Sequence, residues 1–335
     1  MANEPLRAPF PWFGGKRKVA AAVWARFGDV RNYVEPFFGS GAVLLGRPQP
    51  LAGNETINDL DGYVANFWRA TKDAPDEVAR WAANPVNEND LHARHAWLLQ
   101  QRDLLRPRLE GDPHWYDAKV AGWWVWGICC WIGSGFCSGN GPWWVNEARQ
   151  LVHLGNNGQG VNRKRVHLGN NGRDRLLPWF RALSGRLARV RVCSGDWSRV
   201  CGPSVTFKHG LTGVFLDPPY ADTAGRAGAL YREDSLAVAH AVRAWAIENG
   251  HRPDMRIALC GYEGEHEMPE SWSVYAWSAG DGFGGQAKAR TGNGKRERIW
   301  FSPACLSPAK TQQGLQTEQA HNDNKEQAAL EFDSA

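Results

Sequence analysis

The chain has 335 residues, of which 43% are hydrophobic and 22% are charged, and its formal net charge is +4. This balance is close to the globular average for one large domain or two ordinary ones, and the charge is too small to identify a partner. No apolar run approaches the ~18 residues of a membrane span, and no secretory signal opens the chain. The seven cysteines include no Cys-x-x-Cys pair, which argues against a zinc ribbon and a disulfide framework. We therefore expect a cytoplasmic protein without membrane association.

The predicted elements alternate between strands and helices. A strand ends near Pro36, and a glycine turn and a helix-like apolar run at 42–45 follow it. Residues 61–108 are predicted to be largely helical, with candidate core contacts at Trp68, Trp81, Trp97 and Leu98. Further along, the pattern predicts a buried helix or packed turn at 122–133, strands at 190–193, 213–217, 255–260 and 298–302, and a helix at 234–248. Such alternation argues for an α/β sheet.

The middle of the chain interrupts this alternation and indicates an inserted second domain. Residues 115–144 carry seven of the 18 tryptophans, and residues 147–199 carry 11 Arg or Lys against 3 Asp or Glu, a local net charge of +8. The sequence Val-His-Leu-Gly-Asn-Asn-Gly occurs at 152–158 and again at 166–172, where Asn-Gly favours tight turns. Amide and guanidinium groups pair with base edges, and a basic segment suits a phosphate backbone. A solvated basic face and a duplicated surface loop explain the same features.

The sharpest motif is Asp217-Pro218-Pro219-Tyr220, directly after an apolar strand. A carboxylate at the carboxyl end of a sheet strand lies where α/β proteins bind ligands. The two prolines fix the chain and remove two N–H groups, so the carbonyl of Pro218 can point into a pocket beside the Asp217 carboxylate. Two neighbouring acceptors suit an exocyclic NH₂ group, and Tyr220 offers a flat face to a planar base. Taken alone, the tetrapeptide is also compatible with an ordinary strand-ending turn.

Four shorter motifs accompany it. The segment Glu35-Pro36-Phe37-Phe38-Gly39-Ser40-Gly41 places two glycines at the amino end of a helix-like run, where the backbone can approach a ligand closely. It is not the dinucleotide fingerprint, because Leu44 stands where the third glycine would be. The others are Pro11-Trp12-Phe13-Gly14-Gly15-Lys16, Asn58-Asp59 and Gly195-Asp196-Trp197. A tight turn, a solvated acid and a helix cap explain each of them separately.

In this order the motifs closely resemble those of the Dam-like (D12-class, α-group) DNA adenine-N6 methyltransferases, which include phage and prophage enzymes. The family motifs W-x-G-G-K, F-x-G-x-G, Asn-Asp, Gly-Asp-aromatic and D-P-P-Y match Trp12 to Lys16, Phe37 to Gly41, Asn58-Asp59, Gly195-Asp196-Trp197 and Asp217 to Tyr220. The resemblance runs from about Pro11 to Phe301. The resemblance is weak between about Arg69 and Arg189, where the family places its target-recognition domain.

This resemblance implies a Rossmann-like, S-adenosylmethionine-dependent methyltransferase sheet with an inserted, mainly helical target-recognition domain. Residues 1–68 and 190–305 would form the methyltransferase domain, and residues 69–189 the DNA-binding insertion. Residues 306–335 are predicted to be a disordered tail, because they hold almost nothing to bury.

The implied activity is site-specific transfer of a methyl group from S-adenosylmethionine to N6 of a flipped adenine in duplex DNA. The catalytic residues would be Asp217, Pro218, Pro219 and Tyr220, with Asp217 and the Pro218 carbonyl accepting the N6 hydrogens. Trp12, Gly14, Lys16, Phe37, Gly39, Gly41, Asp59 and Asp196 would bind the cofactor, with Asp59 at the ribose and Asp196 at the adenine amino group. No metal is expected, because nothing completes a site beside His92 and His95, which favours a solvated helix face.

Charge and loop placement predict that Arg163, Lys164, Arg165 and Arg173 contact double-stranded DNA. Without an endonuclease segment, an orphan phage or prophage enzyme in the bacterial host cytoplasm is favoured, with a monomer as the default. Three alternatives stay open. The first is cytosine-N4 methylation, although enzymes of that class usually have Ser as the first residue of the tetrapeptide. The second is a DNA clamp that has lost catalysis, and the third is RNA binding by the basic segment.

Overall fold

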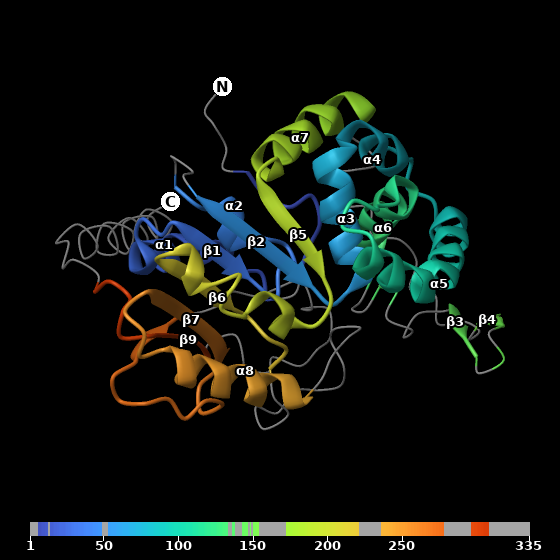
Figure 1. The fold of residues 1–335 in the computed structure, drawn as a ribbon. Coiled ribbons are helices and arrows are strands. Elements are labelled where there is room, and N and C mark those ends of the chain that lie inside the picture. The colour runs from blue at the N-terminus through green and yellow to red at the C-terminus, as the bar shows by residue number, and fades with distance from the viewer. Residues whose placement is uncertain are drawn as a thin grey trace, which may run out of the picture. The chain divides into compact units, whose positions relative to one another are not determined.

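The protein is described by a computed structural model that covers residues 6–12, 14–48, 53–132, 136–137, 143–146, 148, 150–153, 172–220, 236–277 and 296–307. The elements below belong to one compact unit that ends at Cys305. A seven-stranded sheet with the order β5-β2-β1-β6-β7-β9-β8 forms its centre (Figure 1). Its strands are β1 (Asn32–Glu35), β2 (Asn54–Asp59), β5 (Val190–Ser194), β6 (Thr212–Leu216), β7 (Met255–Tyr262), β8 (Ser273–Ala276) and β9 (Glu297–Phe301).

The sheet is mostly parallel. Strands β5, β2, β1, β6 and β7 pair in parallel, whereas β9 runs antiparallel to both β7 and β8. The predicted mixed α/β fold is confirmed, and every strand predicted from the sequence coincides with one of these seven. Strands β2 and β8 escaped prediction because no apolar run marks either strand. Ile57 is the one apolar residue of β2, and Val274 of β8 is 54% exposed.

Eight helices are described. They are α1 (Ala20–Phe27), α2 (Ala42–Leu45), α3 (Gly62–Asp73), α4 (Pro75–Ala82), α5 (Glu88–Gly111), α6 (Ala118–Cys130), α7 (Gly172–Leu187) and α8 (Leu236–Asn249). A short antiparallel hairpin joins β3 (Trp143–Val145) and β4 (Leu151–His153). Side chains of Asp61, Asn87 and Asp117 accept hydrogen bonds from N–H groups in the first turns of α3, α5 and α6, which fixes where these helices begin.

Alternate residues of the strands face opposite sides of the sheet, so each strand contributes to two cores. On one face Tyr33, Ile57 and Phe215 pack in the same core as side chains of α1, α3 and α7. On the other face Val34 and Val214 pack with α8. Both faces of the parallel strands are therefore covered, as an α/β sheet requires.

Helices α3 to α7 pack on one another beside the β5 edge of the sheet (Figure 1). The tryptophan-rich segment forms α6, which confirms the predicted buried helix, and Trp124 and Trp126 are fully buried. Glycine is required at position 122 because an added β-carbon would overlap the side chain of Trp81. The tryptophans of this helix therefore fill a core.

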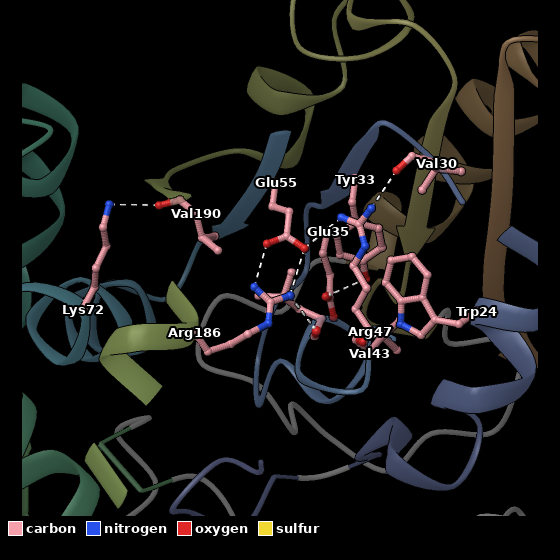
Figure 2. Close-up of polar contacts among 11 residues, drawn as sticks. Trp24, Val30, Tyr33, Glu35, Val43, Arg47, Glu55, Lys72, Arg186 and Val190 are labelled. Carbon is pink, nitrogen blue, oxygen red and sulfur yellow. Dashed lines mark hydrogen bonds and ion pairs between the residues drawn. The ribbon is translucent and has the colours of Figure 1, made fainter. Parts of the chain in front are cut away.

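A buried network of charges ties α7 to the sheet (Figure 2). Arg186 of α7 places its two terminal nitrogens 2.6 and 2.9 Å from the carboxylate oxygens of Glu55 on β2, and Arg47 donates to the same carboxylate at 2.9 Å. Arg47 also donates to the carbonyl of Val30. Lys72 of α3 donates to the carbonyl of Val190, at the start of β5. The helical segment is thus anchored to the sheet at both β2 and β5.

The interpretation of His92 and His95 as a solvated face is wrong for His95. The His95 side chain is completely buried, and its ring lies 4.9 and 5.1 Å from those of Trp131 and Phe136. Burial lowers its pKa to about 4. Helical periodicity placed the two histidines on one face, but the next layer of aromatic residues, which covers His95, does not follow from that periodicity.

The predicted domain boundaries stay predictions. The boundary between residues 68 and 69 falls inside α3, whose buried residues lie on both sides of it. In the part of the chain that the structure describes, no helix is both long enough and apolar enough to span a membrane.

Candidate active site

Two of the sequence motifs meet at the carboxyl ends of the neighbouring strands β1 and β6. The glycine turn follows β1, and Asp217 to Tyr220 follow β6. Strand β1 is the point from which the sheet extends in both directions, through β2 to β5 and through β6 to β7. In open α/β sheets this switch point is where ligands bind.

The glycine turn is shaped by close contact with Trp12. Gly39 and Gly41 have φ angles of +47° and +63°, which residues with a β-carbon rarely adopt. A β-carbon on Gly39 would overlap the Trp12 indole, and one on Gly41 would overlap the ring of Phe38. The turn therefore accepts no side chain at either position, and its backbone lies directly under Trp12.

Asn58 and Asp59 fix this turn from the end of β2. The Asn58 amide donates to the carbonyls of Pro36 and Gly195 at 3.1 and 2.9 Å, which ties together the ends of β1, β2 and β5. Asp59 accepts the N–H groups of Gly39 and Asp61, each at 2.9 Å. Asp59 is half-buried, and its carboxylate is an acceptor of the kind that suits a ligand hydroxyl.

An aromatic pair lies next to Asp196, the second acid predicted to bind the cofactor. The rings of Phe37 and Trp197 are near-parallel, with centroids 6.3 Å apart and an angle of 26° between them. Asp196 accepts from the N–H and the hydroxyl of Ser198, which caps a short 3-10 turn, and its side chain is exposed. The carboxylate acceptors and flat aromatic faces on this side match the hydroxyls and purine of a nucleoside.

In the part of the chain that the structure describes, Asp217 is held through one of its two carboxylate oxygens. Its Oδ1 lies 2.9 Å from the ammonium of Lys16 and 3.4 Å from the hydroxyl of Tyr220. Among the described residues its Oδ2 makes no hydrogen bond, and the side chain is 21% exposed. Pro218 is buried directly beside it. One carboxylate oxygen is tethered, and the other is available as an acceptor.

Tyr220 and Glu297 complete the cluster around Asp217. The sequence motifs predict no role for Glu297. The Tyr220 hydroxyl donates to Glu297 of β9 at 2.7 Å, and its ring meets that of Tyr262 edge-on at 4.5 Å. Lys16 lies 3.9 Å from the same Glu297 oxygen. Burial raises the pKa of Glu297, and burial followed by the charge of Asp217 raises that of Tyr220. The Tyr220 hydroxyl therefore stays protonated at neutral pH.

A second buried acid stands at the end of β1. Glu35 is 2% exposed and accepts the hydroxyl of Tyr33 at 2.7 Å, as Figure 2 shows. Burial raises its pKa to about 8, opposed by the Tyr33 hydrogen bond, and the charge of Asp217 adds to the rise. Glu35 is therefore mostly protonated at neutral pH. The motif that contains it drew attention to its glycines, and burial, which the sequence does not display, makes this acid unusual.

The segment from Trp12 to Lys16 joins the two halves of the site. Trp12 covers the glycine turn, whereas Lys16 contacts Asp217 and donates to the Tyr220 hydroxyl at 3.1 Å. Gly14, with a φ of +70°, provides the carbonyl that accepts from the Lys16 ammonium at 2.8 Å. Lys16 was predicted at the cofactor, and the contacts place it against the D-P-P-Y tetrapeptide.

The predicted DNA contacts cannot be located in the same way. Arg163, Lys164 and Arg165 lie outside the described residues, as does most of the Asn-Asn-Gly repeat, and the side chain of Arg173 in α7 is not described either. Within the described residues no group of three or more His, Cys, Asp or Glu side chains is arranged to hold a metal.

A protein-family model matches the first part of the chain. The model of the D12 class N6 adenine-specific DNA methyltransferases matches residues 12–110, which include Trp12, the glycine turn and Asp59 but end before Asp217. A search of curated proteins found no match. Over residues 12–110 the chain is therefore similar to the D12 class N6 adenine-specific DNA methyltransferases.

Proposed function

We propose that the chain transfers a methyl group from S-adenosylmethionine to N6 of an adenine flipped out of duplex DNA, within one short target sequence. The observation that carries the proposal is the bridge from Trp12 to Lys16. It joins a glycine turn suited to a nucleoside-bearing cofactor with an aspartate suited to an exocyclic amine. Donor and acceptor would thereby meet at adjacent strand ends.

The residues around the glycine turn fit the cofactor. Phe37, Gly39, Gly41, Trp12 and Gly14 would surround its methionine end, Asp59 would accept from the ribose hydroxyls, and Asp196 from the adenine amino group. Both carboxylates are hydrogen-bond acceptors, as ribose hydroxyls and an adenine amino group require. When bound, S-adenosylmethionine supplies a methyl group activated by its sulfonium.

The tetrapeptide fits the adenine. Because adenine N6 is enclosed in the base stack of duplex DNA, the base must leave the stack to reach a carboxylate 21% exposed at a strand end. Oδ2 of Asp217 and the carbonyl of Pro218 would accept the two N6 hydrogens, with Pro219 fixing the turn. The face of Tyr220 would stack on the base. These groups act by positioning the amine and by favouring the positive charge that develops on it.

DNA would be held by the basic middle of the chain. We propose that residues 69–189 form the target-recognition insertion and that Arg163, Lys164, Arg165 and Arg173 contact phosphates or base edges, on the local charge of +8. An orphan phage or prophage enzyme that acts as a monomer in the cytoplasm of a bacterial host fits these features.

The test is transfer of a radioactive methyl group from S-adenosylmethionine to duplex oligonucleotides by the wild-type chain and by Asp217→Ala. Label in adenine from the wild type, none from the variant, and similar DNA affinity for both would support the proposal. Label in cytosine would move the assignment to N4 chemistry. A folded wild type that binds DNA without transferring label would favour a clamp. Tighter binding of duplex RNA than of duplex DNA at one salt concentration would favour an RNA substrate.

A further inference from the structure

Glu297 lies at the centre of the catalytic cluster, yet neither the sequence motifs nor the family match assigns it a role. It opens β9, is 4% exposed, and pairs in register with Tyr262 on β7. Its backbone carbonyl also accepts from the N–H of Trp277. The carboxylate is therefore fixed by a strand on the far side of Asp217 from the glycine turn.

The hydroxyl of Tyr220 faces two carboxylates but has one proton to donate. Glu297 Oε2 lies 2.7 Å from it, and Asp217 Oδ1 lies 3.4 Å away. The first distance is the usual length of an O–H···O hydrogen bond, and the second is at the limit of any hydrogen bond. The Tyr220 hydroxyl therefore donates its hydrogen bond to Glu297. The Lys16 ammonium, 3.1 Å from the same hydroxyl, donates to its lone pair.

We propose that Glu297 is a positioning residue for methyl transfer, which draws the Tyr220 hydroxyl away from Asp217 and holds the Tyr220 ring in place. The inference rests on the proposed function. Without Glu297 the hydroxyl would turn to Asp217 and become a second donor to that carboxylate. An aspartate carboxylate that already accepts hydrogen bonds from Lys16 and Tyr220 is a weaker acceptor for an adenine amine. Each of these donors stabilises the negative charge of the carboxylate, with which the amine must also hydrogen-bond.

The direct test compares Glu297→Met with Glu297→Gln by steady-state methyl transfer. Glu297→Met removes the acceptor and should lower kcat by about 100-fold, the cost of misplacing a catalytic group by about an ångström. Because Glu297 contacts neither cofactor nor DNA in this account, KM for both should stay within about twofold. Glu297→Gln restores a neutral acceptor of the same length and should recover kcat to within about tenfold of the wild type. Equal losses in both variants, or a rise in KM without a fall in kcat, would overturn the inference.

A double-mutant cycle identifies the residue through which Glu297 acts. In a Tyr220→Phe background the hydroxyl is absent, so adding Glu297→Met should lower kcat by no more than about twofold. Independent, multiplying losses would contradict the mechanism. Glu263→Gln serves as the control: Glu263 follows β7, is 63% exposed and pairs with Arg298 at 2.9 Å, so its kcat should match the wild type.

Two measurements separate misfolding from failed positioning. Cofactor binding by calorimetry and thermal unfolding report whether each variant is folded. If Glu297→Met does not fold, Glu297→Asp replaces it, because it keeps the charge but withdraws the acceptor by one methylene; a kcat equal to the wild type would then overturn the inference. A wild type that transfers no methyl group would overturn both this inference and the proposed function, whereas an active wild type with an equally active Glu297→Met overturns this inference alone.

Discussion

The ammonium of Lys16 lies 2.9 Å from Oδ1 of Asp217, so the first motif of the chain pairs directly with the last. Lys16 is 4% exposed, which makes the pair far less screened by water than a surface salt bridge. The contact explains why the W-x-G-G-K and D-P-P-Y motifs occur in one chain: one supplies the cation that fixes the carboxylate of the other.

Lys16→Met should therefore impair the chemical step. Removing the tether frees Asp217 to rotate, and we expect kcat to fall by about 100-fold, as when a catalytic group is misplaced. The Kd for S-adenosylmethionine, measured by calorimetry, should change by less than about twofold, because Lys16 contacts Asp217 and Tyr220 of the tetrapeptide. A large rise in that Kd with kcat retained would instead support the role at the cofactor that the motif predicted.

Gly39→Ala should destabilise the protein through Trp12. The added β-carbon would overlap the indole, and the φ of +47° would be strained as well, so we expect a loss of about 2 kcal/mol or more in the free energy of unfolding. Adding Trp12→Ala to Gly39→Ala removes the overlap and should cost less than the two single losses together. Strictly additive losses in urea unfolding would show that the two residues do not meet.

Arg186→Met should cost about 3 kcal/mol of stability, because it breaks a buried ion pair with Glu55. Arg181, on the same helix, is the matched control. The side chain of Arg181 is 61% exposed and that of its partner Asp76 is 52% exposed. Arg181→Met should therefore leave the urea midpoint almost unchanged. Similar midpoints for the two variants would contradict the anchoring of α7 by Arg186.

Glu35 should make stability depend on pH. Because its folded pKa of about 8 lies above its ordinary value near 4.5, the folded state binds more protons than the unfolded state between these pH values. The stabilising contribution of protonated Glu35 is complete below about pH 4.5 and is lost as the pH rises to about 8. In urea unfolding at a series of pH values, Glu35→Gln should keep the Tyr33 hydrogen bond but lack this decline. A parallel pH profile for variant and wild type would show that Glu35 does not titrate in this range.

Neutralising Arg163, Lys164 and Arg165 together should flatten the salt dependence of DNA binding. If each contacts a phosphate, the slope of log K against log salt should fall by about three units in magnitude, while the cofactor Kd stays unchanged. An unchanged slope would mean that this segment does not touch the DNA backbone.

Much of the fold follows from the sequence, because the strands of a covered parallel sheet are continuous apolar runs. That signal locates β1, β5, β6, β7 and β9. It fails at β2, which is buried but holds a single apolar residue, Ile57, and at β8, whose side chains are largely exposed. The motifs likewise identify the glycine turn and the D-P-P-Y tetrapeptide, since both depend on local backbone geometry.

Contacts between distant segments are what the sequence could not provide. Glu297 approaches Tyr220 only because β9 inserts between β7 and β8, and His95 is buried only because Trp131 and Phe136 cover it. No local sequence pattern predicts either of these contacts. The pairing of Lys16 with Asp217 is of the same kind, because it joins residues 201 positions apart in the sequence.

The proposed activity is adenine-N6 methylation at one short DNA sequence. Its most direct test is single-molecule sequencing, with detection of modified bases, of DNA from a methylation-deficient host that expresses the chain. We predict N6-methyladenine throughout one short motif, and none in a host that expresses Asp217→Ala. Modified cytosine, or no modified base from a folded chain that binds S-adenosylmethionine, would contradict the claim.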